Sequence, residues 1–466
     1  MAYKSVNPYN GELLKSYDDM TDAALESAVK QAQQCYERDW RSKPMTQRAQ
    51  VLKRASMIMR ERIDELARLI TLEMGKLWNE SRGEVALSAD ILEYYAHKGP
   101  EFLAPRSLPM NEGEATVESE PIGILFAVEP WNFPYYQLAR VAGPSLILGN
   151  VMLVKHASNV PQCAEAFERV LKDAGAPRGV YTNLFITKEQ IARLIADPRI
   201  KAVALTGSEA AGSVVAAQAG KSLKKSTMEL GGSDAFIVLE DADMDRAVSW
   251  AVWGRMNNTG QCCIAAKRFI VVENVADEFL RRFAASLQRL KVGDPLDPTT
   301  TLGPLSSEQA LKDILKQVEV AVGAGAKLKL GGRRLNQPGA FIEASILTDI
   351  SRDNPAYYQE FFGPVALFFR VKNEAEAIAL ANDSPFGLGG SVFTEDPERG
   401  KRVARRISTG MVFVNQATWT APNLPFGGIK NSGYGRELAE LGMQEFVNKK
   451  LIRVSGAMPA AEFTVV

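Results

Sequence analysis

The sequence predicts an α/β protein with two doubly wound lobes and a small β arm. Three observations lead to this fold class. The first hundred residues carry helical patterns, short apolar runs alternate with helices beyond Pro121, and a second such series begins near Ala235. Short buried strands that alternate with helices favour a parallel sheet covered on both faces. A chain of 466 residues is long enough for about three domains.

The first hundred residues contain four segments with apolar residues at helical spacing. We expect helices at residues 21–39, 46–60, 63–73 and 84–98. Thr21 is placed to cap the first helix, and Cys35 falls on its apolar side. Residues 102–120 are typical of an extended arm with a turn at its tip, near Met110.

The alternating region that follows has a regular order of strands and helices. Strands are expected at residues 122–128, 150–155, 182–186 and 201–206, and helices at residues 137–148, 161–174, 190–196 and 210–219. The second series runs from a strand at 235–239 to one at 411–415, with long loops at 293–307 and 331–339.

Composition excludes several classes of protein. Lys plus Arg and Asp plus Glu number 55 each, and a net charge of zero argues against nucleic acid or an anionic membrane as partner. Two histidines are too few for a metal cluster built on imidazole, and four cysteines are too few for a disulfide scaffold. The uncharged apolar stretch at residues 141–154 has 14 residues and is broken by Gly and Pro, whereas a membrane-spanning helix needs about 20. The N-terminus does not resemble a secretory signal. We therefore expect a cytoplasmic protein without a metal.

Two adjacent cysteines, Cys262 and Cys263, stand beside Gly260 and Gln261, between an expected helix and a strand. The polar neighbours suggest an accessible thiol, and a thiolate is a strong nucleophile. A buried structural thiol is the alternative interpretation.

Two further segments carry polar groups next to rigid backbone. Glu229 precedes the pair Gly231 and Gly232, and in an apolar setting its raised pKa would suit a general base; a solvated acid in a turn is the alternative. Asn132 lies between two prolines, after an expected buried strand, and offers an amide donor.

The segment Thr206–Gly207–Ser208 has the order strand, small-residue turn and helix. Backbone N–H groups at such a helix start can hold a phosphate. The segment lacks the full glycine fingerprint of dinucleotide-binding proteins, so a simple tight turn is equally compatible. Residues 360–365 and 425–437 are further glycine-rich, rigid segments.

In this order and at these spacings, the motifs resemble the aldehyde dehydrogenase superfamily over nearly the whole chain, from about Val6 to Val454. The resemblance implies that Cys263 is the nucleophile, that Asn132 and the Cys263 backbone N–H form an oxyanion hole, and that Glu229 activates the hydrolytic water. It also implies a set of cofactor-contacting positions, which are Trp131, Lys155, Ser158, Thr206, Gly207, Ser208, Glu360 and Phe362.

The resemblance implies a division of the chain as well. Residues 1–104 and 122–231 would bind a nicotinamide dinucleotide, and residues 232–434 would carry the thiol. Residues 105–121 and 435–457 would form an oligomerisation domain, in which the arm pairs with a strand near residues 451–454. A homodimer or homotetramer is the implied assembly.

The family often has a glutamate three residues after the lysine that corresponds to Lys155, where it binds the adenosine ribose. Here that residue is Ser158, so we expect NADP to be preferred and NAD to be accepted. The alternative is that Ser158 only caps the next helix.

The implied reaction is oxidation of an aldehyde to an acid, with succinic semialdehyde as the expected substrate. Arg140 and Tyr136 are four residues apart on one helical face, and arginine binds carboxylates through paired hydrogen bonds. We expect Arg140 to hold the acid end of the aldehyde, helped by Tyr136, Thr418 or Thr420. An internal ion pair of Arg140 is the alternative.

Other interpretations remain open at this point. Another short or acidic aldehyde is one alternative substrate. A thiol hydrolase that works without a nucleotide would need a base such as His156, and a binding protein built on this fold is a third class. Cys262 is also a candidate for a reversible disulfide with Cys263, as against simple packing.

Overall fold

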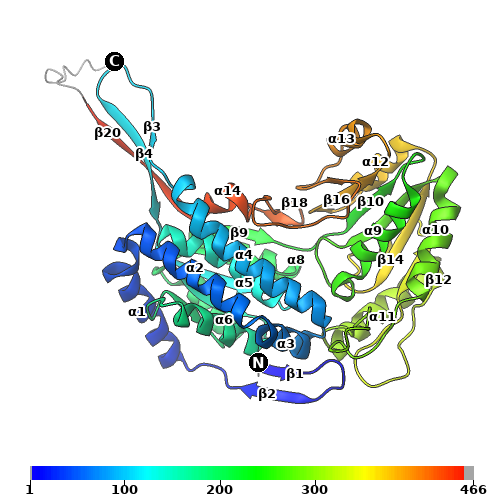
Figure 1. Cartoon of the computed structure of the whole chain (residues 1–466), viewed down its shortest axis with the longest axis horizontal. Helices are drawn as coiled ribbons and strands as arrows, with labels where there is room; N and C mark the ends of the chain where they lie inside the picture. Colours follow the sequence, from blue (N-terminus) through cyan, green and yellow to red (C-terminus); the bar gives the residue numbers. More distant parts are fainter. Residues whose placement is uncertain (1–2, 456–466) are drawn as a thin grey trace.

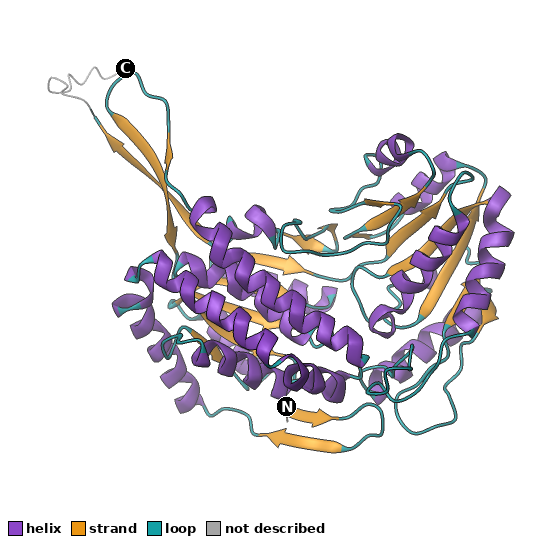
Figure 2. Cartoon of the chain, viewed as in Figure 1, coloured by secondary structure: helices purple, strands orange, loops and turns teal. Residues whose placement is uncertain are grey.

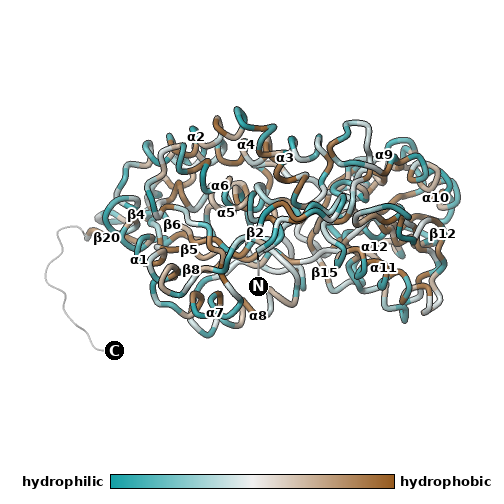
Figure 3. The backbone as a smooth tube through the Cα atoms, turned by 90° about the horizontal axis from the view of Figure 1, so that it is seen from below, coloured by the Kyte–Doolittle hydropathy of each residue, from teal (hydrophilic) through white to brown (hydrophobic). Residues whose placement is uncertain are grey.

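The computed structural model describes residues 3–455 of the chain. Two lobes, each built around its own sheet, lie next to each other, and a narrow arm projects from the first lobe (Figures 1 and 2). Hydrophobic residues are concentrated in the central strands of the first lobe, whereas its outer helices are largely hydrophilic (Figure 3). The predicted α/β class is confirmed.

The first lobe contains a six-stranded sheet in the order β19-β9-β8-β5-β6-β7. Its strands are β5 (Ile124–Glu129), β6 (Val151–His156), β7 (Tyr181–Asn183), β8 (Ile200–Thr206), β9 (Lys225–Glu229) and β19 (Gly433–Tyr434). All neighbours are parallel except β19, which runs antiparallel to β9. The strand order reverses between β5 and β8, and ligands of such sheets bind at the carboxyl ends of the strands near that point.

Helices cover this sheet on both faces. They are α1 (Asp22–Arg38), α2 (Met45–Glu61), α3 (Ile63–Met74), α4 (Trp78–Phe102), α5 (Pro134–Leu148), α6 (Pro161–Asp173), α7 (Lys188–Ala196) and α8 (Glu209–Lys221). Thr21 caps α1 as predicted, since its side chain accepts a hydrogen bond from the Ala24 N–H at 3.2 Å. Helix α4 begins earlier than expected, because its first turns are polar and lack apolar periodicity. Every residue of α5 is buried.

The second lobe contains a seven-stranded sheet in the order β12-β13-β14-β11-β10-β16-β17. The strands are β10 (Asp234–Val238), β11 (Ala266–Val272), β12 (Lys327–Leu330), β13 (Ser345–Thr348), β14 (Val365–Val371), β16 (Gly390–Phe393) and β17 (Phe413–Val414). Only β12 is antiparallel to its neighbour. The helices are α9 (Met244–Met256), α10 (Glu273–Gln288), α11 (Glu308–Gly323), α12 (Glu374–Asn382) and α13 (Pro397–Ala404).

Side chains of this second sheet alternate between two apolar cores. Ile237 and Ile270 belong to one core, whereas Phe236 and Phe269 belong to the other, on the opposite face. Both faces of the sheet are therefore covered, as the uninterrupted apolar strands predict.

The arm is a three-stranded antiparallel sheet of β3 (Arg106–Ser107), β4 (Glu114–Pro121) and β20 (Val447–Val454). The expected pairing is confirmed, because Leu451 lies opposite Val117. Leu451 and Val454 are more than half exposed, at 59% and 56%.

The C-terminal part of the chain returns to the first lobe before it enters the arm. Strand β19 joins the first sheet, and α14 (Ala439–Met443) packs against α4 and α5. Residues 433–443 therefore belong to the first lobe, whereas the thiol domain was expected to end at residue 434 and the oligomerisation domain to begin there. A small ladder of β15 (Phe386–Gly387) and β18 (Ile429–Lys430) precedes this return. An N-terminal hairpin, β1 (Tyr3–Val6) and β2 (Leu13–Tyr17), was not expected. No helix among residues 3–455 is long and apolar enough to cross a membrane.

Candidate active site

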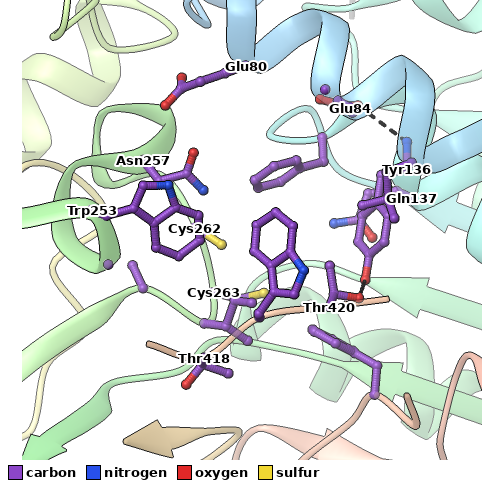
Figure 4. A pocket seen from close by; sticks show the side chains of 18 residues that line it. Glu80, Glu84, Tyr136, Gln137, Trp253, Asn257, Cys262, Cys263, Thr418 and Thr420 are labelled. Carbon is purple, nitrogen blue, oxygen red and sulfur yellow. Dashed lines mark hydrogen bonds between the residues drawn. The ribbon is translucent and has the colours of Figure 1, made fainter. Parts of the chain in front are cut away.

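A cavity of about 300 Å³ lies between the two lobes, and both adjacent cysteines line it (Figure 4). Helices α4 and α5 form one wall, and α9 with the segment after it forms the other. Aromatic rings dominate the lining, namely those of Phe133, Tyr136, Trp253, Trp419 and Phe426. No lysine or arginine of the described chain lines this cavity.

Cys263 stands on a loop whose backbone is held from several sides. After α9, Asn258 and Thr259 adopt left-handed conformations with φ of 53° and 54°, which costs free energy for residues other than glycine. The Asn258 side-chain amide donates to the carbonyl oxygens of Asn132 and Gln261, at 2.8 and 3.1 Å. These bonds stabilise the strained turn that precedes the two cysteines.

Lys267 holds the backbone on the other side of the cysteines. Its buried ammonium donates to the Cys262 and Cys263 carbonyl oxygens, at 2.8 and 2.7 Å, and pairs with Glu360 at 2.9 Å. Glu360 also accepts the Gly232 N–H at 3.1 Å. Glu360, a predicted cofactor residue, therefore lies beside the thiol loop.

The two thiols differ in access. Cys262 is 7% exposed, whereas Cys263 is only partly buried. Contact with the Cys262 sulfur, together with burial, raises the pKa of Cys263 well above its ordinary value. Cys263 is therefore a neutral thiol in this arrangement, and it needs a base before it can act as a nucleophile.

Glu229 ends β9 and is 2% exposed, so the alternative of a solvated turn acid is wrong. Neither carboxyl oxygen has a hydrogen-bond partner among the described residues. Burial raises the pKa of Glu229 well above its ordinary value, and the nearby charge of Glu437 raises it further. A β-carbon at Gly427 would lie 2.6 Å from a Glu229 oxygen, so the glycine leaves room for this carboxyl group. A buried carboxyl with a raised pKa is suited to accept a proton near neutral pH.

Asn132 is fixed just before α5. Its side-chain amide donates to the Gln261 carbonyl oxygen at 3.1 Å, and its own carbonyl oxygen accepts from Lys76 at 2.9 Å. These contacts tie the predicted oxyanion donor to the loop that carries the thiols.

His156 lies outside this group. Its ring nitrogens face the backbone carbonyl oxygens of Glu129 and Pro134, at 3.1 and 3.0 Å. Burial lowers the pKa of His156 to about 4. The ring is a structural contact between β5, β6 and α5, so it is not placed to serve as the base of a thiol hydrolase.

A second cavity, of about 410 Å³, brings together three predicted cofactor residues, Trp131, Ser158 and Phe362. The rings of Trp131 and Phe362 meet edge to face with centroids 5.8 Å apart. Hydroxyl and amide groups, including those of Ser307 and Gln309, complete the lining. Ser158 does not cap the next helix, because α6 has Val160 as its N-cap.

Several polar groups of the segment before α8 already form hydrogen bonds within the protein. The Gly207 N–H donates to the Glu229 carbonyl oxygen at 2.9 Å, and the Ser208 hydroxyl caps α8 by accepting the Ala211 N–H at 3.3 Å. The Thr206 hydroxyl accepts from Arg140 at 3.1 Å. Contacts of this segment with a cofactor stay a prediction.

Arg140 does not face the aldehyde cavity, contrary to expectation. Its guanidinium lies over the rings of Tyr136 and Phe426, which separate it from the cavity. It forms an ion pair with Glu437, and both side chains are buried. The physical reason is that α5 is buried on all sides, so a charge on its inner face needs an internal partner. The alternative of an internal ion pair is the one that the structure shows.

The other predicted substrate residues do reach the cavity. Tyr136, Thr418 and Thr420 line it, and the hydroxyls of Tyr136 and Thr420 are 2.9 Å apart. Thr418 donates to the buried Asp234 at 2.9 Å. Sequence reasoning missed Glu437, although it belongs to the glycine-rich segment 425–437. It also missed the positioning role of Lys267, which follows the two cysteines by four residues.

Comparison with known proteins agrees with this geometry. The model of the aldehyde dehydrogenase family matches residues 1–452. A succinate-semialdehyde dehydrogenase [NADP(+)] of Deinococcus radiodurans is 51% identical over 97% of this chain and 94% of that protein. A probable enzyme of the same name from Synechocystis is 46% identical over 98% of this chain and all of its own length.

Solved structures are similarly close. Succinic semialdehyde dehydrogenase from Streptococcus pyogenes, in complex with NADP+, superimposes with a TM-score of 0.96 at 46% identity, over 97% of this chain and 100% of that one. A structure from a study of cofactor and substrate selection by Gox0499 reaches a TM-score of 0.97 at 52% identity, over 98% and 100% of the two chains. The chain belongs to the aldehyde dehydrogenase family.

Proposed function

We propose that this enzyme oxidises succinic semialdehyde to succinate through a thioester on Cys263, with NADP as the preferred cofactor and NAD as a poorer one. The single observation that carries the proposal is that Cys263 lines the cavity between the lobes while the Asn132 amide is hydrogen-bonded to the loop that carries this thiol. Glu229, which is buried and has no hydrogen-bond partner among the described residues, is the base that the proposal assigns. The names of the relatives in Deinococcus and Synechocystis support both the substrate and the cofactor.

The residues present fit a phosphorylated dinucleotide. Ser158 is uncharged, so it does not repel a 2′-phosphate, and Lys155 lies in no ion pair among the described residues. Trp131 and Phe362 would flank the nicotinamide end, near Glu360. When bound, NADP supplies the acceptor for the hydride that leaves the substrate.

The chain's own groups carry the rest of the reaction. The Cys263 thiol releases its proton to solvent and its sulfur adds to the aldehyde carbon, and the resulting oxyanion accepts hydrogen bonds from the Asn132 amide and the Cys263 N–H. After oxidation the acyl group remains on Cys263 as a thioester. Glu229 takes a proton from water, the hydroxide cleaves the C–S bond, and the acid leaves while the sulfur is freed.

The acid end of the substrate needs hydrogen-bond donors, and the cavity provides hydroxyls in place of a cation. Tyr136 and Thr420 lie next to each other, and the Arg140 guanidinium donates to the Tyr136 oxygen at 3.3 Å. We infer that these two hydroxyls receive the carboxylate and that the positive charge of Arg140, one layer behind them, strengthens the binding.

A specific observation favours a second candidate substrate, an uncharged aldehyde of similar size. The lining is mainly aromatic. Among the described residues, its ionisable groups are the two thiols, the Tyr136 hydroxyl and the carboxyls of Glu80 and Glu84. Glu84 is neutralised by Lys76, but a carboxylate substrate still meets no direct cation there.

The deciding experiment compares succinic semialdehyde with butanal, which has the same number of carbons and no acid group. We expect a higher kcat/KM for succinic semialdehyde, and a higher kcat/KM with NADP than with NAD. A higher kcat/KM for butanal would favour the second candidate, and an absence of turnover with NADP would refute the cofactor assignment.

We also propose a homodimer or homotetramer, because the arm exposes apolar side chains of β20 and an unpaired strand edge. Size-exclusion chromatography with light scattering tests this. A cytoplasmic location stays a prediction, which agrees with four free cysteines.

A further inference from the structure

A row of three polar residues at the start of α4 faces the active site. Lys76, just before the helix, is followed at intervals of four residues by Glu80 and Glu84. Residues four apart lie on one face of a helix, and both carboxyl groups extend from α4 toward the aldehyde cavity (Figure 4). We call these three residues the α4 stripe.

Two members of the stripe hold the segment that carries Asn132. The Lys76 ammonium pairs with Glu84, and both side chains are only 1% exposed. The same ammonium donates to the Asn132 carbonyl oxygen at 2.9 Å. Glu84 also accepts the N–H groups of Tyr135 and Tyr136, at 2.8 and 3.3 Å. The ion pair therefore fixes Asn132 and the first turn of α5 as one unit.

The third member, Glu80, reaches the second lobe. Its carboxyl group accepts the Asn258 N–H at 3.0 Å, in the left-handed turn that precedes the two cysteines. At the start of the same helix, the Trp78 N–H donates to the Pro295 carbonyl oxygen of the second lobe at 2.8 Å. A strained backbone conformation persists only where its surroundings hold it. Helix α4, an element of the first lobe, thus supports the thiol loop of the second.

The two sets of contacts meet at Asn132. Its carbonyl oxygen accepts from Lys76 and also from the Asn258 side chain, at 2.9 and 2.8 Å. Its side-chain amide donates one N–H to Gln261 at 3.1 Å, which leaves the second N–H for an oxyanion. A hydrogen bond weakens steeply as its angle departs from linearity. The strength of the oxyanion contact therefore depends on how firmly the Asn132 backbone is held.

Stability alone does not account for the buried pair of Lys76 and Glu84. Desolvation of two charges offsets most of their attraction, and apolar residues of similar volume often stabilise a fold at least as well. The contacts of this pair with the backbone of residues 132–136 give it a second role, which is to hold the oxyanion donor in place.

We propose that the α4 stripe positions the oxyanion donor against the thiol. The pair of Lys76 and Glu84 fixes the oxyanion segment, and Glu80 fixes the loop that carries the thiol. This inference rests on the proposed thioester route, in which Asn132 stabilises the oxyanion. All three are positioning residues, because they act through the backbone that they hold. Loss of the stripe should slow the chemical step and leave cofactor binding intact.

The double variant Lys76→Met/Glu84→Gln removes both charges of the pair. The new amide oxygen can still accept the N–H groups at the start of α5, whereas the Asn132 carbonyl oxygen loses its charged donor. We measure the rate of NADPH formation in the first turnover, because this step precedes thioester hydrolysis. We expect this rate to fall about ten- to hundredfold at saturating succinic semialdehyde, as misplacement of a catalytic group implies, with an unchanged Kd for NADP.

Lys98→Met/Glu101→Gln is the matched control. It removes an exposed ion pair at the far end of the same helix and should keep the wild-type rate. If the rate of Lys76→Met/Glu84→Gln equals that of the control, the inference is overturned. If the wild type itself forms no NADPH, the proposed function fails instead.

Combination with Asn132→Ala separates positioning from a general loss of structure. If the stripe acts through Asn132, adding Lys76→Met/Glu84→Gln to Asn132→Ala should slow the first turnover by no more than about twofold further. The same loss factor with and without Asn132→Ala would contradict the positioning role. If Asn132→Ala alone keeps the wild-type rate, Asn132 is not the oxyanion donor, and that part of the proposed function fails together with the inference.

Glu80 provides a test that leaves the ion pair intact and that serves even if the pair variant does not fold. Burial raises the pKa of Glu80, so Glu80→Gln is a close replacement that can still accept the Asn258 N–H, whereas Glu80→Leu cannot. We expect Glu80→Gln to stay within about threefold of the wild-type first-turnover rate and Glu80→Leu to lose about tenfold or more. Equal rates in the two variants, or a loss confined to KM for the aldehyde, would refute the role of Glu80.

Discussion

The guanidinium of Arg140 is paired with the carboxylate of Glu437, and both groups lie buried behind the aldehyde cavity. Two more buried carboxyls, Glu129 and Glu229, lie close enough for their charges to interact with Arg140. One arginine therefore faces three acids, and the protonation of Glu229 depends on this cluster.

Removal of Arg140 should destabilise the fold. Arg140→Ala leaves Glu437 buried without its partner, which costs about 3–5 kcal/mol of unfolding free energy. Urea denaturation of Arg140→Ala, Glu437→Ala and the double variant measures the coupling. We expect the double variant to lose clearly less than the sum of the single losses; strict additivity would mean that the pair does not form.

Tyr136→Phe isolates the acid end of the substrate. It removes the hydroxyl that faces Thr420 and keeps the aromatic wall. We expect KM for succinic semialdehyde to rise roughly five- to twentyfold, as the loss of a hydrogen bond to a charged group implies, with KM for butanal nearly constant. Equal changes for both aldehydes would mean that the hydroxyl serves the fold alone.

Ser158→Glu should shift the cofactor preference towards NAD. The new carboxylate would repel a 2′-phosphate and could bind the ribose hydroxyls instead. The ratio of kcat/KM for NADP and NAD measures the shift, with Ser307→Ala in the same cavity as a control. An unchanged ratio would show that Ser158 does not determine the cofactor preference.

The roles of the two adjacent cysteines are separable. Cys263→Ala should abolish oxidation and leave nucleotide binding intact, whereas Cys262→Ala should retain much of the activity, because only Cys263 is partly exposed. After mild oxidation, peptide mapping of the wild type should find a 262–263 linkage that reductant reverses. If oxidation inactivates the Cys262→Ala variant to the same extent, and reductant restores its activity equally well, the 262–263 linkage is not the cause of inactivation.

The buried Glu229 carboxyl should make the stability of the fold fall as pH rises. Burial raises its pKa in the folded state, so the stability that its protonated form contributes is present at acidic pH and is lost as pH rises through the folded pKa. Glu229→Gln should therefore gain Tm relative to the wild type as pH increases, while it loses oxidation. A Tm difference that does not vary with pH would contradict the raised pKa.

The sequence predicts the strands and most helices because apolar runs and their spacing are local signals. The N-terminal hairpin was not predicted, because β2 has no buried residue and its sequence therefore shows no alternating apolar pattern. The orientation of Arg140 could not be predicted, since α5 is buried all round and has no polar face to set its direction. Its partner Glu437 comes from the far C-terminal part of the chain, which only the tertiary fold brings near. Cys263 and Glu229 could be singled out as candidates from the sequence because glycines and polar residues mark their segments, and their roles stay predictions.

Oxidation of succinic semialdehyde should pass through a thioester on Cys263. Glu229→Gln, mixed with NADP and succinic semialdehyde and quenched in acid, should trap this thioester, because the variant lacks the base for hydrolysis. Tryptic residues 256–267 contain both cysteines, and fragment-ion mass spectrometry locates the adduct. We predict a succinyl group on Cys263 that forms with NADP and is absent when no nicotinamide cofactor is added; a succinyl group on Cys262, or none at all, would refute the assignment.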